Sequence, residues 1–411
     1  MSVPPAAIAD QGAAGRPMHV MIVTPTLDTG AADAGAVELT RILSAAGHRT
    51  TVVSRAGRMV ADVTTAGGRF VPLDVATANP FGMLRNAAVL VRLARETNCD
   101  CIHALGRSGA WSALFAARLC GRPFITSWYK GFREQNLFKR LYNGVMARGD
   151  RIVAVSEQIA QLIVDRYATP WSRLAVVPCS VDLVRFDPDR MTAERLDAIR
   201  RTWGVGPETK VIVVVGRILR RKGHDVVVKA VQRLKARGLK DLLCVFVGED
   251  RGATHYTGEL WDQVLATGTM DAIRMAAPVH DMPAAYAAAT VVVSAALQPE
   301  GLQRSLLEAQ AMRRPIIVSD LAAGTDVVPT APAVPEARVA GLRVPAGDDE
   351  ALATALLRVF AMPAPTRDAI GARGRDWVVG HFHPSGVAEQ TLWLYSDAMG
   401  RPYAFGARAA A

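Results

Sequence analysis

This sequence repeatedly alternates short apolar runs with segments of helical periodicity, and this pattern limits the folds that the chain can adopt. In the first half the apolar runs are HVMIVTPT, RTTVVS, FVPLD, CIHALG, PFITSW, RIVAVS and LAVVP. Apolar runs without polar alternation are typical of parallel strands that are buried on both faces. Helices are expected between several of them, at residues 34–46, 81–96, 110–120, 136–147 and 157–167. The alternation predicts a doubly wound α/β domain.

The alternation stops once and then restarts. Residues 178–209 carry turn signals at both ends and an amphipathic segment between them, which is typical of a connection between domains. Strand-like runs then return as KVIVVVGR, LLCVFVGED, AIRMAAP, TVVVSA and PIIVSD. We therefore expect a flexible tail (1–17), an N-terminal domain (18–184), a connection (185–209), a C-terminal domain (210–384) and a final helix with a tail (385–411).

Composition fits this division. A chain of 411 residues, half of them apolar and 21% charged, is long enough for two globular domains. No apolar run approaches the roughly eighteen residues of a membrane span, and the N-terminus lacks the pattern of a secretory signal. The five cysteines show no paired metal-ligand spacing, so we interpret them as buried free thiols in a reducing compartment. These features predict a cytoplasmic protein.

The charge balance favours anionic partners. The formal net charge is +10 and the pI is near 9.7. Nucleic acid is not expected as a partner, because no zinc-finger, helix-turn-helix or RNP pattern is present. The densest basic segment, residues 130–151, mixes Lys and Arg with Phe, Leu and Tyr. It is open to two interpretations, a solvated helix face with a core stripe or a contact with the anionic surface of the inner membrane.

Two segments at the expected carboxyl ends of strands carry candidate binding residues. In VIVVVGRILRRKGHD, Gly216 and Arg217 end a strand, and Lys222 precedes a helix. Glycine allows a ligand to approach the backbone, and cations beside a helix N-terminus bind phosphate oxygens. A solvated arginine after a strand would give the same pattern. In open α/β sheets ligands bind beyond the carboxyl ends of the strands, which favours the binding interpretation.

The stretch PEGLQRSLLEAQAM places two glutamates around the start of another helix. Glu300 falls in the loop, the helix is expected to begin near Arg304 or Ser305, and Glu308 lies inside it. Glu308 could accept hydrogen bonds from the two adjacent hydroxyls of a ribose, and Glu300 from a sugar on the same ligand. Alternatively, Glu308 is a helix-surface residue, and Glu300 is an acid favoured by the helix dipole.

The E-x₇-E spacing and the upstream G-R-x₄-K pattern together resemble the donor site of family 4 glycosyltransferases of the GT-B fold. The resemblance extends over nearly the whole chain, through HALGRSGAWSALFAARLCGRPF, YNGVMARGDRIVAVSEQIA, VDLVRFDP, DMPAAYAAATVVVSA and LLEAQAM. These stretches are similar to bacterial members that build surface glycans, notably lipopolysaccharide cores.

The resemblance implies two Rossmann-like domains facing a central cleft, with the final helix, 384–399, crossing back onto the N-terminal domain. It implies a nucleotide-sugar donor, a glycan or lipid-linked acceptor, transfer with retention of anomeric configuration, and no metal. It assigns the catalytic positions to Glu300, Arg217 and Lys222. Arg217 and Lys222 would hold the diphosphate, Glu308 the ribose and Glu300 the donor sugar. The donor-binding set that it implies is Gly30, Gly216, Arg217, Lys222, Glu300, Leu302, Gln303, Arg304 and Glu308.

The chain departs from the family pattern near the expected sugar and acceptor positions. The Gly-Gly-x-Glu turn is replaced by Gly30, Ala31 and Asp33, and a His-Gly after the fifth strand is replaced in SWYKGF. Gln303 stands where the family has a glycine. Arg313 replaces a helix-ending glycine and is expected to adopt a left-handed conformation at a cost of about 1 kcal/mol. A Gly-Gly-x-x-Glu motif is replaced by Ala322, Ala323, Gly324, Thr325 and Asp326.

These departures leave three hypotheses. The chain is an active transferase with unusual donor or acceptor selectivity, or a non-catalytic homologue that binds a nucleotide sugar or assists assembly, or another GT-B enzyme such as an epimerase.

Overall fold

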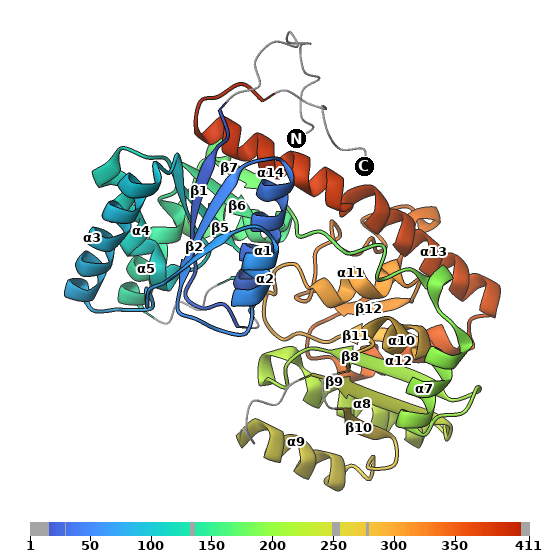
Figure 1. The fold of residues 1–411 in the computed structure, drawn as a ribbon. Helices are drawn as coiled ribbons and strands as arrows, with labels where there is room; N and C mark the ends of the chain where they lie inside the picture. The colour runs from blue at the N-terminus through green and yellow to red at the C-terminus, as the bar shows by residue number, and fades with distance from the viewer. Residues whose placement is uncertain (1–15, 29, 132–135, 249–254, 277–278, 404–411) are drawn as a thin grey trace. The chain divides into compact units, whose positions relative to one another are not determined.

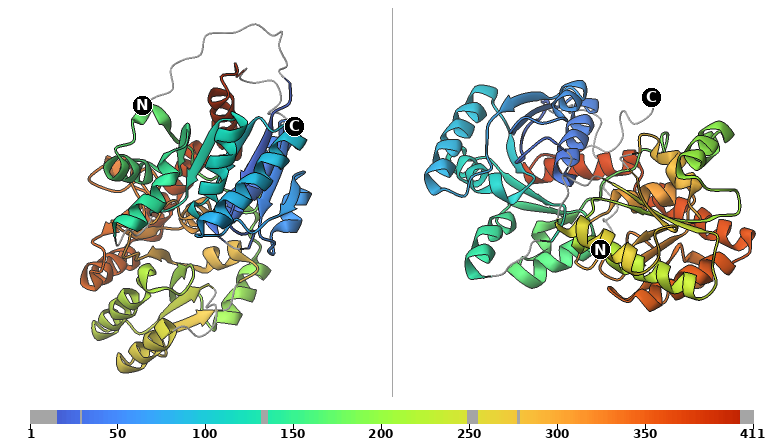
Figure 2. Two further views of the ribbon diagram at one scale, coloured as in Figure 1. Left: turned by 90° about the vertical axis from the view of Figure 1, so that its left-hand side faces the viewer. Right: turned by 90° about the horizontal axis from the view of Figure 1, so that it is seen from below.

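A computed structural model describes residues 16–28, 30–131, 136–248, 255–276 and 279–403 of the chain. Most of the expected tails, residues 1–15 and 404–411, lie outside these ranges. The chain forms two compact units. Unit 1 comprises residues 1–155, 159–177 and 387–411, and unit 2 comprises residues 156–158 and 178–386. Each unit is built around one parallel sheet with helices on both faces (Figures 1 and 2), so the predicted pair of α/β domains is confirmed.

Unit 1 contains a seven-stranded parallel sheet with the order β3-β2-β1-β4-β5-β6-β7. All seven predicted runs form strands, and most of their residues are buried. Continuous burial explains why these runs lack polar alternation. The strands are β1 (His19–Val23), β2 (Arg49–Ser54), β3 (Arg69–Pro72), β4 (Cys101–Ala104), β5 (Phe124–Trp128), β6 (Arg151–Ala154) and β7 (Leu174–Val176).

The five helices predicted in unit 1 all form, but the one predicted at 110–120 begins at Arg107, and a helix at Val60–Thr65 was not predicted. The first helix begins at Ala31 rather than Ala34, because the Asp33 carboxylate accepts a hydrogen bond from the Gly30 N–H (2.9 Å) and caps the helix start. The predicted helix at 136–147 divides at Gly144 into α5 and a 3₁₀ turn. The helices are α1 (Ala31–Ala45), α2 (Val60–Thr65), α3 (Pro80–Thr97), α4 (Arg107–Cys120), α5 (Leu137–Asn143), α6 (Glu157–Tyr167), which starts within unit 2, and the 3₁₀ turns η1 (Gly144–Ala147) and η2 (Trp171–Arg173).

The end of the final helix, α14 (Pro384–Ala398), packs on unit 1. Tyr395 is fully buried, and its hydroxyl lies 2.7 Å from Nδ1 of His103 in β4. The other ring nitrogen of His103 lies 2.8 Å from the Ser127 hydroxyl in β5. Arg151 donates to Asp397 at 2.5 Å. These polar contacts attach the last turns of α14 to β4, β5 and β6 of unit 1.

Unit 2 contains a six-stranded parallel sheet with the order β10-β9-β8-β11-β12-β13. The five predicted runs form β8 to β12, and β13 was not predicted. The strands are β8 (Lys210–Val215), β9 (Leu242–Val247), β10 (Ile273–Ala276), β11 (Val291–Ser294), β12 (Ile316–Ser319) and β13 (Gly341–Val344). The helices are α7 (Ala193–Trp203), α8 (His224–Ala236), α9 (His255–Ala266), α10 (Met282–Ala288), α11 (Arg304–Ala311), α12 (Asp349–Ala361), α13 (Ala364–His381), and the 3₁₀ turns η3 (Pro188–Arg190), η4 (Arg220–Lys222) and η5 (Glu336–Arg338).

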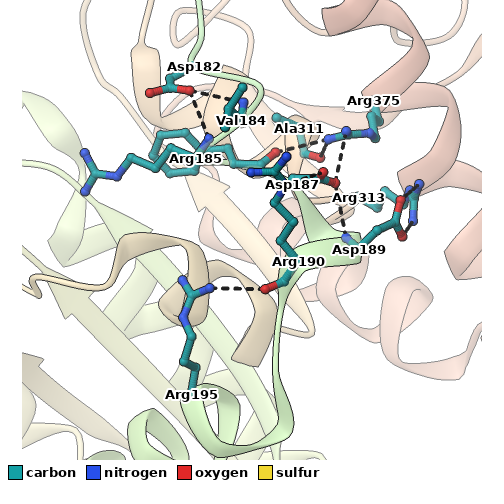
Figure 3. A network of polar contacts seen from close by, with 11 residues as sticks. Asp182, Val184, Arg185, Asp187, Asp189, Arg190, Arg195, Ala311, Arg313 and Arg375 are labelled. Atoms are coloured by element: carbon teal, nitrogen blue, oxygen red, sulfur yellow. Dashed lines mark hydrogen bonds and ion pairs between the residues drawn. The ribbon is translucent and has the colours of Figure 1, made fainter.

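The expected connection, residues 185–209, lies within unit 2 and is bound to it by polar contacts, several of which Figure 3 shows. Arg195 donates to both carboxylate oxygens of Asp281 at 2.8 and 2.7 Å. Arg313 makes a similar paired contact with Asp189 at 2.6 and 2.9 Å. Arg375 donates to the carbonyl oxygen of Phe186 at 3.1 Å. This segment is therefore part of the folded body of unit 2.

Candidate functional site

The candidate site lies in unit 2, at the carboxyl ends of β8 and β11 and the start of α11. Two glycines shape its backbone. Gly216 follows β8 with φ of +144°, and Gly223 precedes α8 with φ of +70°, both of which L side chains rarely adopt. A Cβ atom on Gly223 would also overlap the carbonyl oxygen of Ala295. Glycine at this position lets the start of α8 approach the segment that follows β11.

Four cations stand between these two glycines. Arg217 and Arg220 are exposed, whereas Arg221 and Lys222 are half-buried. The Lys222 ammonium donates to Glu300 Oε2 at 3.1 Å and to the side-chain oxygen of Gln303 at 3.1 Å. Arg221 forms an ion pair with the other oxygen of Glu300. Burial, and then the charge of Arg217, lower the pKa of the Arg221 guanidinium. Positive charge is thus concentrated at the end of β8.

Glu300 is almost fully buried, at 7% exposed, in the loop between β11 and α11. Its N–H donates to the carbonyl oxygen of Leu321 at 3.1 Å, which attaches this loop to the one after β12. The carboxylate is shared between Arg221 and Lys222. The structure therefore brings together two of the residues that the sequence predicted, Lys222 and Glu300, and adds Arg221, which it did not predict.

Gln303 occupies the position where the family pattern has a glycine. Its amide nitrogen donates to the Ser294 hydroxyl at 3.0 Å and to the carbonyl oxygen of Ala322 at 2.9 Å. Its amide oxygen accepts from Lys222. The neighbouring Leu302 is also buried, whereas Arg304 is partly exposed at the first position of α11. The side chain of Gln303 thus links both loops of the site to its lysine.

Glu308 lies on α11, which begins at Arg304 as predicted. Its carboxylate accepts a hydrogen bond of 2.8 Å from the buried hydroxyl of Tyr286 on α10. Burial raises the pKa of Glu308, and the hydrogen bond from Tyr286 opposes this effect. The alternative of a solvated surface glutamate is therefore wrong, because the group is half-buried and held in place by a partner that the sequence did not reveal.

The loop after β12 holds the other departures from the family pattern. The Asp326 carboxylate accepts a hydrogen bond of 2.9 Å from the N–H of Glu157, and burial raises its pKa. A Cβ atom on Gly324 would overlap this carboxylate. Arg343 of β13 donates to the carbonyl oxygen of Ala323 at 2.8 Å. Ala322 and Ala323 are both buried, so this loop is held in place by packing and hydrogen bonds with other residues of the chain.

Gly30, the remaining predicted donor residue, lies in unit 1 at the start of α1. Asp33 closes the turn by accepting from the N–H groups of Asp28 and Gly30 at 3.0 and 2.9 Å and from the Thr26 hydroxyl at 3.1 Å. The turn is therefore formed without the second glycine of the family pattern.

The basic segment at 130–151 is described except for residues 132–135. Its helix α5 does not bury a core stripe, because Leu137, Phe138 and Leu141 are 81%, 84% and 61% exposed. Lys139 and Arg140 on the same helix are also exposed. The structure thus places apolar and basic side chains together on an accessible surface.

Within the described residues, no helix has the length and apolar character that a membrane span requires. Nor do those residues bring together three or more His, Cys, Asp or Glu side chains that could hold a metal ion. All five cysteines are free; four are buried and Cys120 is partly exposed, in agreement with the prediction of free thiols.

Comparisons with known proteins agree with this architecture. Residues 33–185 match the family described as Glycosyltransferase Family 4, and residues 209–362 match the family described as Glycosyl transferases group 1. A D-inositol 3-phosphate glycosyltransferase from Salinispora tropica is 31% identical over 264 residues, which cover 62% of this chain and 52% of that protein. The chain therefore spans about half the length of this curated relative.

Two solved structures have the same fold. A glycosyltransferase from Rickettsia africae is similar with a TM-score of 0.83 and 23% identity, over 93% of this chain and 99% of its own. HepE from Anabaena, solved in complex with UDP-glucose, is similar with a TM-score of 0.78 and 17% identity, over 92% of this chain and 100% of its own. These likenesses confirm the expected GT-B fold of two Rossmann-like domains.

Proposed function

Because the chain belongs to the family 4 glycosyltransferases of the GT-B fold, we propose that it transfers a sugar from a nucleotide-sugar donor to an acceptor. The observation that carries this proposal is the contact between Lys222 and Glu300 at the carboxyl edge of the unit 2 sheet, with Glu308 nearby on α11. Parallel α/β sheets bind ligands at this edge.

Each charged group has a role in this proposal. Arg217 and Lys222 bind the diphosphate, and their charge stabilises it as the leaving group. Glu308 accepts hydrogen bonds from the ribose hydroxyls, and Glu300 contacts the donor sugar. Gly216 lets the backbone approach the phosphates, and the dipole of α11, which begins at Arg304, favours an oxygen-rich ligand at the helix start. Leu302 and Gln303 form the wall beside the sugar, and Gly30 lies on the acceptor-side unit.

A uridine nucleotide is the first donor to test, since HepE, which has a similar fold, was solved with UDP-glucose. We propose that no divalent metal is required, because Arg217 and Lys222 supply positive charge where a metal would otherwise neutralise the diphosphate. Transfer should then continue in excess EDTA. We further propose that the anomeric configuration of the sugar is retained, which proton NMR of the product determines.

For the acceptor, we propose a glycan or lipid-linked saccharide, in the synthesis of lipopolysaccharide or another surface polysaccharide. A cytoplasmic location and a contact between α5 and the anionic inner membrane accord with a lipid-linked acceptor. The inositol 3-phosphate glycosyltransferase of Salinispora tropica favours a second candidate, a small phosphorylated polyol. The two acceptor classes differ in whether transfer depends on a lipid surface.

The experiment is a two-step screen of the purified chain. UDP-, GDP- and ADP-sugars are first compared by thermal shift, where a donor at a hundred times its Kd adds about 2.7 kcal/mol of stability. The stabilising donor is then incubated with lipid-linked saccharides and with inositol phosphates. Product formation supports a transferase and identifies the acceptor class. Donor binding without transfer to any acceptor, and without donor hydrolysis, would instead support the non-catalytic homologue.

A further inference from the structure

A cavity lies in unit 2 at the amino-terminal edge of the sheet, the edge opposite the candidate donor site. It is lined by residues that precede β8, β11 and β12, together with side chains from α7 and α13, and it encloses about 280 Å³. Lys210 opens β8 at this cavity, whereas Gly216 ends the same strand at the donor site. The two sites are therefore separated by the length of the strand.

The lining of this cavity is strongly cationic. Among the described residues, five cations and two carboxylates line it, namely Arg200, Lys210, Arg313, Arg314, Arg367, Glu208 and Asp368. Arg313 is already paired with Asp189 (Figure 3). For Arg200, Lys210 and Arg367, no described carboxylate lies within ion-pair distance. The side chains of these three residues thus leave positive charge uncompensated at the cavity.

The carbonyl groups at helix ends account for the presence of one cation at this cavity but not for the presence of the others. Three helices, α7, α10 and α11, end at this edge of the sheet, and their carbonyl groups favour nearby positive charge. Arg314 meets this need by donating to the carbonyl oxygens of Met312, Ala287 and Ala289 at 3.0, 3.4 and 3.5 Å. Within the described residues, the side chains of Arg200, Lys210 and Arg367 make no such bond, so their charge remains available for a ligand.

Electrostatics within the cavity support the same conclusion. Burial lowers the pKa of the Arg314 guanidinium, and the charges of Arg367, Arg313 and Arg200 lower it further, opposed by Asp368 alone. These cations repel one another across a partly enclosed space, and an anion that binds between them offsets this unfavourable interaction. Arg313 also holds a backbone conformation with φ of +54°, which is costly for a non-glycine residue and is more frequent at functional sites.

We propose that this cavity binds the phosphate group of a small phosphorylated molecule. Guanidinium groups match the geometry of phosphate oxygens and form charge-assisted hydrogen bonds with them. The space of about 280 Å³ far exceeds the roughly 10–15 Å³ that a single water molecule needs, which leaves room for an ester group beyond the phosphate itself. The site is separate from the donor site, so its ligand regulates or accompanies transfer rather than supplying the transferred sugar.

The test is calorimetric titration of the full chain with inorganic phosphate and with glycerol 3-phosphate, at constant ionic strength set with KCl. The Lys222→Ala background is used alongside the parent, so that phosphate bound at the donor site is recognised. We expect saturable binding in both proteins. The double variant Arg200→Ala/Arg367→Ala should weaken it at least about tenfold, because two charge-assisted contacts are lost. Arg358→Ala, an exposed arginine on α12 that does not line the cavity, is the matched control.

Each outcome decides a separate point. Tighter binding of glycerol 3-phosphate than of inorganic phosphate supports a phosphate ester as the ligand. Tighter binding of inorganic phosphate would instead identify the free ion as the ligand. Binding that disappears in Lys222→Ala would place the phosphate at the donor site and overturn the proposal. It would also be overturned if neither compound bound beyond the KCl control, or if the double variant bound as the parent does while retaining its melting temperature.

Discussion

The ammonium group of Lys222 lies 3.1 Å from Oε2 of Glu300, a residue 78 positions further along the chain. This contact joins the segment after β8, where phosphates are expected, to the loop where the donor sugar is expected. A diphosphate that binds Lys222 would therefore alter the surroundings of the carboxylate beside the sugar. Loss of either residue should affect the position of the other.

The two glutamates of the donor site should have different kinetic effects. Glu308 would bind ribose hydroxyls equally in ground and transition states, so Glu308→Gln should raise KM for the donor more than it lowers kcat. Glu300 would act where charge develops on the sugar, so Glu300→Gln should mainly lower kcat. Steady-state kinetics with a confirmed donor and acceptor measure both. Equal, purely KM-type effects would reduce Glu300 to a binding residue.

Arg221 is expected to position Glu300 rather than to bind substrate. Arg221→Ala leaves the carboxylate with Lys222 alone, and losing a charge-assisted contact of about 1.5–3 kcal/mol should lower kcat roughly tenfold or more. Arg221→Lys should restore part of the activity because it keeps the charge. The matched control is Arg220→Ala, which removes an exposed cation paired with Glu259. An equal loss in both alanine variants, or no rescue by lysine, would argue against positioning.

Contact with a membrane should depend on both the apolar and the basic side chains of α5. Partition onto anionic vesicles should fall as salt is added, because screening weakens the attraction. Phe138→Ser/Leu141→Ser should lower it further, since burial of each such side chain contributes about 1.5–3 kcal/mol. Leu119→Ser is the control, because Leu119 is 67% exposed on α4, outside this segment. Salt-insensitive partition, or an equal loss of partition in the test and control variants, would contradict the proposed membrane contact.

His103 should make stability depend on pH. Burial lowers its pKa from 6.5 to about 3, so the folded chain stays neutral there while the unfolded chain takes up a proton. The contribution of the neutral His103 ring to the free energy of unfolding is complete above pH 6.5. It is lost as pH falls toward 3, by up to about 1.4 kcal/mol per pH unit. Urea unfolding at pH 7 and pH 5 measures it. His224, also buried with a pKa of about 4, acts in the same direction, so the comparison is with His103→Gln.

If His103 carries this effect, the loss of stability from pH 7 to pH 5 should be smaller in His103→Gln than in the parent. The variant is less stable overall, because contacts with Tyr395 and Ser127 are changed, but only the difference between the two pH values is compared. An identical pH dependence in both proteins would show that His103 takes up a proton in the folded chain as readily as in the unfolded chain.

Most of the fold was predictable from the sequence because strands buried on both faces are continuous apolar runs. The exception is β13, GLRV, which is short and contains Arg343. That arginine reaches away from the strand to Thr330 and to the carbonyl oxygen of Ala323, contacts that no local pattern reveals. The left-handed conformation of Arg313 was also predicted and is confirmed, with φ of +54°.

The candidate site was predictable only in part. Parallel strands place their carboxyl ends at one edge, so the proximity of Lys222 and Glu300 followed from topology. The contacts of Arg221, Tyr286 and Gln303 did not, because they depend on side-chain directions across elements distant in sequence. A partial signal was present in the basic run RRK and in the single tyrosine of AAYAA, which has alanines on both sides.

We expect a nucleotide sugar to bind in unit 2 through Lys222, and calorimetric titration of the chain with UDP-, GDP- and ADP-sugars measures this binding. The parent chain should bind at least one of them saturably. Lys222→Ala should weaken that binding about ten- to a hundredfold, the effect of losing a charge-assisted contact. Lys229→Ala, which removes an exposed lysine from α8, should bind as the parent does. Unchanged affinity in a folded Lys222→Ala variant, or absence of binding by the parent to every nucleotide sugar, would be incompatible with donor binding through Lys222.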